Sequence, residues 1–222
     1  MHMRTVIAED HVLFRELFRK VCEVECGCIV VGETGTGRNA KRIIAATQPD
    51  LVVLDLRLPD GDGFEVAEFI RFRCPSVQIL MISSHCDDYT LFQVERAGVQ
   101  GFVDKNSQSI KSLALAIQAL QRGETWYSPA YLEAKQARVT DPANFAKVLS
   151  ERECAVLSLI GSSLSNGEIA QRLGISPITA QTHRNHIMHK LGIPGSAKLV
   201  HFALEHGFTP LVTQRNGKPV LS

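Results

Sequence analysis

Three carboxylates stand at the ends of two apolar runs near the start of the chain. Glu9 and Asp10 follow the run 5–8, and Asp55 follows the run 51–54. Short apolar runs of this kind, each followed by a helical pattern, are typical of buried strands in a parallel sheet. Ligands bind outside the carboxyl ends of such strands. Three like charges gathered there favour a hard divalent cation with oxygen ligands, and we expect Mg²⁺.

Two further side chains suited to phosphoryl chemistry occur at the ends of later apolar runs. These are the hydroxyl of Ser83 and the ammonium of Lys105. A cation held by the three carboxylates would screen an attacking aspartate from the charge of a phosphoryl group. The point charge of a lysine suits one phosphoryl oxygen, and a hydroxyl can donate to another. Catalysis by such a site is mostly positioning and charge neutralisation.

The elements that must position these side chains follow from hydrophobic periodicity. Apolar runs at 4–8, 28–32, 51–55, 78–83 and 100–104 alternate with amphipathic stretches near 11–24, 37–47, 62–72, 87–97 and 107–122. Five strand-helix repeats predict an α/β fold with a doubly wound parallel sheet. We place this domain at 1–125 and interpret 126–148 as a linker. Residues 149–208 show only helical periodicity, which predicts an all-α domain, and 209–222 are expected to form a flexible tail.

Composition and charge agree with two small globular domains. The chain has 222 residues, of which 45% are hydrophobic and 21% charged. It lacks an apolar run approaching the ~20 residues that cross a membrane and lacks a secretory signal, so we expect a cytoplasmic protein without a membrane partner. Residues 4–125 carry 14 basic against 17 acidic side chains, whereas 150–222 carry seven against four. An acidic first part and a basic second part suggest two different tasks.

The order and spacing of the N-terminal landmarks resemble a response-regulator receiver domain, which has a CheY-like, five-stranded sheet. The resemblance implies that Asp55 is the phosphoacceptor, with the acidic pair Glu9 and Asp10 beside it. It also implies catalytic roles for Ser83 and Lys105.

Two more roles rest on the same resemblance. The backbone carbonyl of Arg57 is a further expected ligand of Mg²⁺. Phe102 stands at the position of the switch aromatic, which would turn inward when Ser83 moves toward a phosphoryl group. Phe102 could equally be a static aromatic of the core.

Helix signals organise the C-terminal part into four helices. Ser150 and Glu153 form the pattern of a capping box, and a second helix starts after Ser165. After a short turn, Ser176 caps a third helix that runs to about residue 191, and a fourth lies near 196–206. Two short helices joined by a tight turn are typical of a helix-turn-helix, whose second helix enters the major groove of DNA.

This part of the chain also resembles the four-helix DNA-binding domain of LuxR/FixJ/NarL-type regulators. Transfer of the family's roles by position gives three candidates for contacts with base edges: Gln181, Thr182 and Asn185. It also gives three candidates for contacts with phosphates: Thr179, Arg184 and Lys190. Amide side chains suit adenine and a threonine methyl suits thymine, while phosphate contacts fix the register. Members of this family usually have lysine at the position of Gly167, so the glycine of this chain removes one contact with the DNA backbone.

Together the two resemblances imply a transcription factor of the NarL/FixJ type and not an enzyme. A sensor histidine kinase would phosphorylate Asp55. Phosphorylation would promote a homodimer on promoter half-sites about one helical turn apart, with RNA polymerase as a further partner. The alternative is a phosphorylation-independent DNA-binding regulator that uses the receiver as a dimerisation scaffold.

Three other features invite functional interpretations that we do not favour. The glycine-rich segment 32–39 nearly matches a phosphate-binding loop, but arginine and asparagine replace its essential lysine and hydroxyl, so a tight turn is the better interpretation. Cysteines at 22, 26 and 28 could bind a soft metal or sense oxidation, although buried thiols are the simpler interpretation. His186 and His189 stand three residues apart and could bind a metal, but buried or groove-side histidines are the simpler interpretation.

Overall fold

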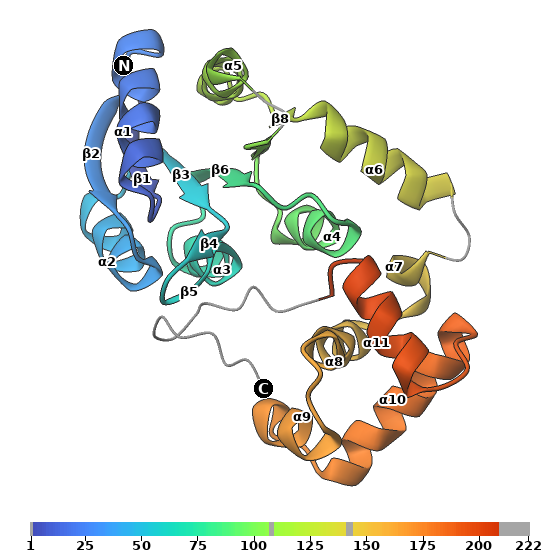
Figure 1. Ribbon diagram of the computed structural model, residues 1–222. Helices are drawn as coiled ribbons and strands as arrows, with labels where there is room; N and C mark the ends of the chain where they lie inside the picture. The colour runs from blue at the N-terminus through green and yellow to red at the C-terminus, as the bar shows by residue number, and fades with distance from the viewer. Residues whose placement is uncertain (1, 107–108, 141–143, 209–222) are drawn as a thin grey trace. The chain divides into compact units, whose positions relative to one another are not determined.

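The computed structural model describes residues 2–106, 109–140 and 144–208, and the chain divides into two compact units (Figure 1). The first unit contains the residues up to Cys86 and Gln93–Leu132. The second contains Asp87–Phe92 and the described residues of 133–208. In the part of the chain that is described, no helix has both the length and the apolar character needed to cross a membrane.

A parallel sheet forms the centre of the first unit. Its strand order is β2-β1-β3-β6-β7-β8, and the strands are β1 (Arg4–Ala8), β2 (Ile29–Thr34), β3 (Leu51–Asp55), β6 (Gln78–Ser83), β7 (Gly101–Asp104) and β8 (Trp126–Tyr127). The first five strands match the predicted runs to within a few residues. The sixth corrects the expected five-stranded sheet, because Trp126 and Tyr127 pair with the start of β7 inside the segment interpreted as a linker.

Helices cover both faces of this sheet (Figure 1). They are α1 (Val12–Lys20), α2 (Gly37–Thr47), α3 (Gly63–Arg73), α4 (Asp88–Ala97) and α5 (Ile110–Gln121), and a π-helical turn, η1 (Val21–Glu25), extends α1. On one face, Phe18 and Ile117 from α1 and α5 pack in a core with Ile7, Val53 and Leu80 from the strands. Burial on both faces explains why the strands are continuous apolar runs rather than alternating patterns.

A hairpin of β4 (Arg57–Leu58) and β5 (Gly61–Asp62) joins β3 to α3. The helix begins at Gly63, whose backbone N–H donates to the carbonyl of Leu56 at 2.7 Å. A Cβ atom on Gly63 would lie 2.5 Å from the carbonyl oxygen of Asp55. Glycine is therefore required for α3 to start so close to the end of β3, and this close approach fixes the backbone of Asp55.

Replacing Gly63 with alanine is expected to lower the free energy of unfolding of the first unit by about 2 kcal/mol, because the obstructing atoms belong to the backbone and must move. Urea unfolding of the full chain measures this change. Gly61→Ala is the matched control in the same hairpin, since its Cβ would meet only the flexible carboxylate of Glu65 at 3.4 Å. Equal stability of the two variants would contradict the prediction.

The second unit is helical. It contains α7 (Phe145–Val148), α8 (Glu151–Gly161), α9 (Asn166–Leu173), α10 (Pro177–Leu191) and α11 (Ser196–Glu205), and α6 (Pro129–Thr140) precedes them. Capping boxes start α8 and α9 at Ser150 and Ser165, and Ser176 caps α10. Gly174 and Gly192 end α9 and α10 in the left-handed conformation that glycine adopts without strain. The predicted four-helix pattern thus corresponds to α8–α11.

The segment 126–148 contains β8, α6 and α7, so it is more structured than a linker was expected to be. The placement of the domain boundaries stays a prediction. The expected flexible tail, 209–222, lies outside the described residues.

Candidate functional sites

The carboxyl ends of neighbouring strands bring the predicted phosphoryl-transfer residues together. Glu9 follows β1, Asp55 ends β3, and Lys105 follows β7. The Lys105 ammonium donates to Glu9 Oε2 at 2.8 Å and to Asp55 Oδ2 at 2.9 Å.

In the sequence, Lys105 lies 96 residues from Glu9 and 50 residues from Asp55, so the order of the strands alone brings the three side chains together.

The electrostatics of this cluster follow from its burial. The side chains of Glu9, Asp55 and Lys105 are 0%, 6% and 10% exposed. Burial, and then the neighbouring charge of Asp55, raises the pKa of Glu9, while Lys105 offsets part of this rise. Burial of the Lys105 ammonium works against its charged form, but the charge of Asp55 and the hydrogen bond with Glu9 outweigh burial and raise the pKa of Lys105. The cluster therefore holds more negative charge than its lysine compensates.

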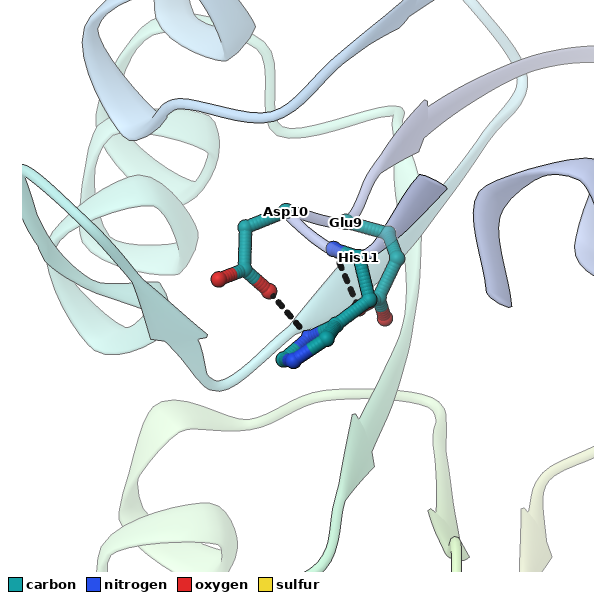
Figure 2. Close-up of side chains that lie close together, drawn as sticks. All are labelled: Glu9, Asp10 and His11. Atoms are coloured by element: carbon teal, nitrogen blue, oxygen red, sulfur yellow. Dashed lines mark hydrogen bonds and ion pairs between the residues drawn. The ribbon is translucent and has the colours of Figure 1, made fainter. Parts of the chain in front are cut away.

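Asp10 lies beside this cluster and pairs with a residue that the sequence analysis missed. His11 Nδ1 is 2.8 Å from Asp10 Oδ1 and 3.5 Å from Glu9 Oε1 (Figure 2). Among the residues that the structure describes, Glu9, Asp10 and His11 are the one group of three potential metal ligands whose ligand atoms all lie within 4.8 Å of one another. Asp55 was expected in this group, but its carboxylate contacts Lys105 instead. A histidine directly after two acidic residues was the signal that could have revealed His11.

Arg57, Ser83 and Phe102 are the other residues predicted for this site. The backbone N–H of Arg57 donates to Asp55 Oδ1 at 3.3 Å, which holds this stretch of backbone against the Asp55 carboxylate. Ser83 is buried at the end of β6, and its hydroxyl oxygen accepts a hydrogen bond from the backbone N–H of His85 at 2.9 Å. Phe102 is fully buried, with its ring centroid 5.8 Å from that of Tyr131. Burial fits both a static core aromatic and the inward state of a switch, so the switch role stays a prediction.

Two aromatic rings of α1 also face the lysine. The Lys105 ammonium lies 5.0 Å from the ring centroid of Phe14 and 5.9 Å from that of Phe18. Cations at such distances are attracted by the electron-rich faces of aromatic rings. Nothing in the sequence pattern connected these phenylalanines to the site, because they occupy apolar positions of a helix.

The glycine-rich segment is not an open phosphate-binding loop in this structure. The backbone N–H groups of Gly37 and Arg38, at the start of α2, donate to the carboxylate of Asp60 at 2.6 and 2.9 Å. Desolvation opposes ionisation of this carboxyl, but the two N–H groups outweigh it and hold the pKa of Asp60 below its ordinary value. A carboxylate of the same chain thus occupies the anion-binding end of the helix, which supports interpreting the segment as a turn.

The cysteines also have a simple structural setting. Cys22 and Cys28 belong to the apolar core beside α5, and Cys26 is partly buried. Within the described ranges, no group of three potential metal ligands includes a cysteine. A hydrogen bond from the thiol of Cys22 lowers the pKa of Cys28 to about 7, whereas burial raises the pKa of Cys26 to about 11. A sensing role for these thiols remains a separate hypothesis.

The candidate DNA-binding side chains lie on α10, the second helix of the helix-turn-helix. Five of them are exposed: Thr179, Gln181, Thr182, Asn185 and Lys190. Arg184 differs from the expectation, because its side chain is buried rather than free to meet a phosphate. It falls on the inner stripe of α10 with Ala180 and Ile187, and it donates to Asn166 Oδ1 at 2.9 Å and to the carbonyl of Leu164 at 3.2 Å.

Lys190, near the end of α10, has an ion-pair partner. Its ammonium lies 2.8 Å from Oε2 of Glu153, the residue that closes the capping box of α8. The same carboxylate oxygen accepts hydrogen bonds from the backbone N–H and the hydroxyl of Ser150, at 2.8 and 2.9 Å. Glu153 thus joins the start of α8 to the end of α10.

This arrangement predicts a pH-dependent contribution to stability. Burial opposes ionisation of Glu153, but Lys190 and Ser150 outweigh burial and hold the pKa of Glu153 below its ordinary value. A group whose pKa is lower in the folded state stabilises the fold above its unfolded pKa and loses that contribution as the pH falls through the folded pKa. Glu153→Gln is therefore expected to cost about 1–2 kcal/mol of unfolding free energy at pH 7 and much less near pH 3.5.

Urea unfolding of the full chain at both pH values measures this difference. Glu168→Gln is the matched control, because Glu168 closes the capping box of α9 but, among the described residues, forms no ion pair with a lysine. We expect a smaller effect of that substitution at pH 7. A loss for Glu153→Gln that is equal at the two pH values would contradict the prediction.

Comparison with known proteins identifies the family of both parts of the chain. A family model of the response regulator receiver domain matches residues 5–118, and one of bacterial regulatory proteins of the luxR family matches residues 147–203. The oxygen regulatory protein NreC of Staphylococcus aureus is 32% identical over 215 residues, covering 91% of this chain and 97% of NreC.

Two solved structures are similar as well. The RcsB response regulator of Salmonella typhimurium has a TM-score of 0.61 at 25% identity, covering 91% of this chain and 98% of that one. A LuxR-family two-component response regulator from Aurantimonas sp. has a TM-score of 0.58 at 31% identity, covering 63% of this chain and 99% of that one.

A receiver domain followed by a LuxR-type helix-turn-helix defines the class of protein: a two-component response regulator with a DNA-binding output. The chain belongs to the NarL/FixJ family of these regulators, which are transcription factors and not enzymes. This confirms the predicted family, fold class and absence of an enzymatic role.

Proposed function

We propose that a sensor histidine kinase phosphorylates Asp55 and that phosphorylation promotes dimerisation and promoter binding. The observation that carries this proposal is the placement of the Asp55 carboxylate, which lies at the carboxyl edge of the sheet and 2.9 Å from the ammonium of Lys105. The close start of α3 at Gly63 fixes the backbone of the acceptor. A carboxylate held in this way is positioned to attack phosphorus.

The donor set fits a divalent cation. Glu9, Asp10 and Asp55 supply carboxylate oxygens, the ligands that Mg²⁺ prefers, and their combined charge exceeds that of Lys105. We therefore propose that these carboxylates, with the backbone carbonyl of Arg57, hold Mg²⁺. The cation would supply charge neutralisation for the phosphoryl oxygens.

The side chains of the protein have distinct roles in the transfer. An oxygen of Asp55 forms the new bond to phosphorus as the bond between phosphorus and the donor breaks. Lys105 then exchanges its contact with the Asp55 carboxylate for one with a phosphoryl oxygen. The Ser83 oxygen accepts from His85, which leaves its own hydrogen for a second phosphoryl oxygen. Movement of Ser83 toward the phosphoryl group would then allow Phe102 to turn inward.

The output unit supports the second half of the proposal. Its exposed α10 residues include Gln181, Thr182 and Asn185, which we propose as readers of base edges, with Thr179 and Lys190 as phosphate contacts. The similar response regulator RcsB interacts with DNA. We propose that a homodimer binds paired promoter half-sites and contacts RNA polymerase there. We also propose that the protein acts in the cytoplasm.

A comparison of dimerisation and DNA binding with and without phosphorylation tests this function. Full-length protein is treated with acetyl phosphate and Mg²⁺, and its mass in solution and its retention of promoter fragments are compared for wild type and Asp55→Ala. We expect treatment to increase dimerisation and DNA retention for wild type alone. Equal dimerisation and equal DNA binding in both proteins, with or without treatment, would favour the receiver as a phosphorylation-independent dimerisation scaffold.

A further inference from the structure

A chain of hydrogen bonds runs across the surface between α9 and α10. Arg184 Nε donates to Asn166 Oδ1 at 2.9 Å, and Asn166 Nδ2 donates in turn to Gln181 Oε1. Gln181 Nε2 then donates to Asn185 Oδ1 at 2.8 Å. Arg184 and Asn166 thus stand behind two of the side chains that we propose as readers of base edges.

The direction of this chain is fixed at its buried end. A guanidinium has only donors, so Arg184 requires an oxygen from Asn166. Arg184 itself is 8% exposed, and the carbonyl of Leu164 holds it from the other side. Once the oxygen of Asn166 is turned inward, its amide nitrogen must face Gln181. Gln181 then presents its oxygen to Asn166 and its nitrogen to the oxygen of Asn185.

The last member of the chain therefore has a defined polarity. Asn185 is exposed, and its oxygen already accepts from Gln181. Its amide nitrogen is the group left to meet a base. In the major groove, N7 and O6 of guanine are both acceptors, whereas adenine presents one acceptor and one donor.

We propose that Asn166 is a specificity-determining residue: with Arg184 it orients Gln181 and Asn185, so that Asn185 presents a donor to a base edge rich in acceptors, with guanine preferred. The inference rests on the proposed function, because it assigns a base preference to the DNA-binding face of α10. Asn166 is a positioning residue in this scheme and needs no contact with DNA. It also revises the expectation that the amides of α10 read adenine.

Asn166→Asp tests the proposal by reversing the polarity. A carboxylate still accepts from Arg184 but cannot donate to Gln181, so the amide of Gln181 turns its nitrogen toward the new carboxylate. Its oxygen then faces the Asn185 nitrogen, and the Asn185 oxygen faces the groove. We expect the preferred base to change from guanine to one that presents a donor, adenine or cytosine, with a change of about tenfold in relative affinity at that position.

The measurement is selection from a randomised duplex library by full-length protein treated with acetyl phosphate, followed by affinities for the selected sites. Gly167→Asp is the matched control, because it adds the same charge to the next residue, where a Cβ would meet only Ser165 Oγ at 3.9 Å. We expect this control to bind more weakly without a change in base preference. Gln181→Glu provides a second route to the same reversal, since its carboxylate can accept from both Asn166 and Asn185.

The outcomes separate the inference from the function on which it rests. Sequence-selective binding by wild type, with an unchanged base preference in both Asn166→Asp and Gln181→Glu, would overturn the inference alone. Failure of wild type to select any sequence would overturn the proposed function and the inference with it. A change of preference that also occurs in Gly167→Asp would mean that charge, rather than amide direction, sets the preference, and would likewise overturn the inference.

Discussion

Asp55→Ala is expected to abolish the phosphoryl adduct that wild-type protein forms with a small phosphodonor and Mg²⁺. The attacking oxygen must lie at the carboxyl edge of the sheet next to the Lys105 ammonium, and Asp55 Oδ2 is held there at 2.9 Å. Intact-protein mass spectrometry after incubation with acetyl phosphate measures the adduct directly. The expected effect is a complete loss and not a change of rate.

Asp60→Ala is the matched control, because Asp60 is an acidic residue of the hairpin that follows β3 and its carboxylate accepts from the backbone at the start of α2. This variant should keep the adduct. An adduct of equal size on Asp55→Ala would identify a different acceptor. No adduct on any of the three proteins would favour the scaffold alternative.

Lys105→Met is expected to lower the unfolding free energy of the receiver by about 3 kcal/mol in metal-free buffer, and Mg²⁺ should recover part of this loss. The substitution keeps an apolar chain against Phe14 and Phe18 but leaves the buried carboxylates of Glu9 and Asp55 without a cation. A divalent ion bound to the folded state replaces the missing charge. Urea unfolding with EDTA and with Mg²⁺ measures both effects.

Lys41→Met serves as the control, because the Lys41–Glu65 ion pair lies at the surface, with side chains 32% and 63% exposed, and surface pairs contribute at most about 1 kcal/mol. Mg²⁺ should stabilise Lys105→Met more than wild type or this control. Equal stabilisation of all three proteins would show that the carboxylate cluster is not where the ion acts.

Most of the receiver fold could be predicted from the sequence, because its buried strands are continuous apolar runs with charged or hydroxyl side chains at their ends. β1, β3 and β6 fall where the runs at 4–8, 51–55 and 78–83 place them. β8 was missed because two residues carry no periodicity, and its pairing with β7 is a long-range contact. The cap that Asp60 provides for α2 was missed for the same reason, since 22 and 23 residues separate the partners.

The burial of Arg184 was missed for a different reason. Transfer by position from the family gave it a phosphate contact, but its spacing from Ala180 and Ile187 places it on the buried stripe of α10. Helical periodicity alone would have given the correct side of the helix. A buried arginine needs acceptors, and the carbonyl of Leu164 and the amide of Asn166 supply them. The sequence cannot show those partners because they belong to the preceding turn and helix.

The ion pair between Glu153 and Lys190 has a consequence for how DNA binding responds to ionic strength. A lysine that neutralises a phosphate releases a condensed counterion, and each such contact steepens the dependence of affinity on salt. Lys190 already has Glu153 as a counterion within the protein, so meeting DNA exchanges one anion for another. The salt dependence should therefore be shallower than the number of basic residues on the output unit suggests.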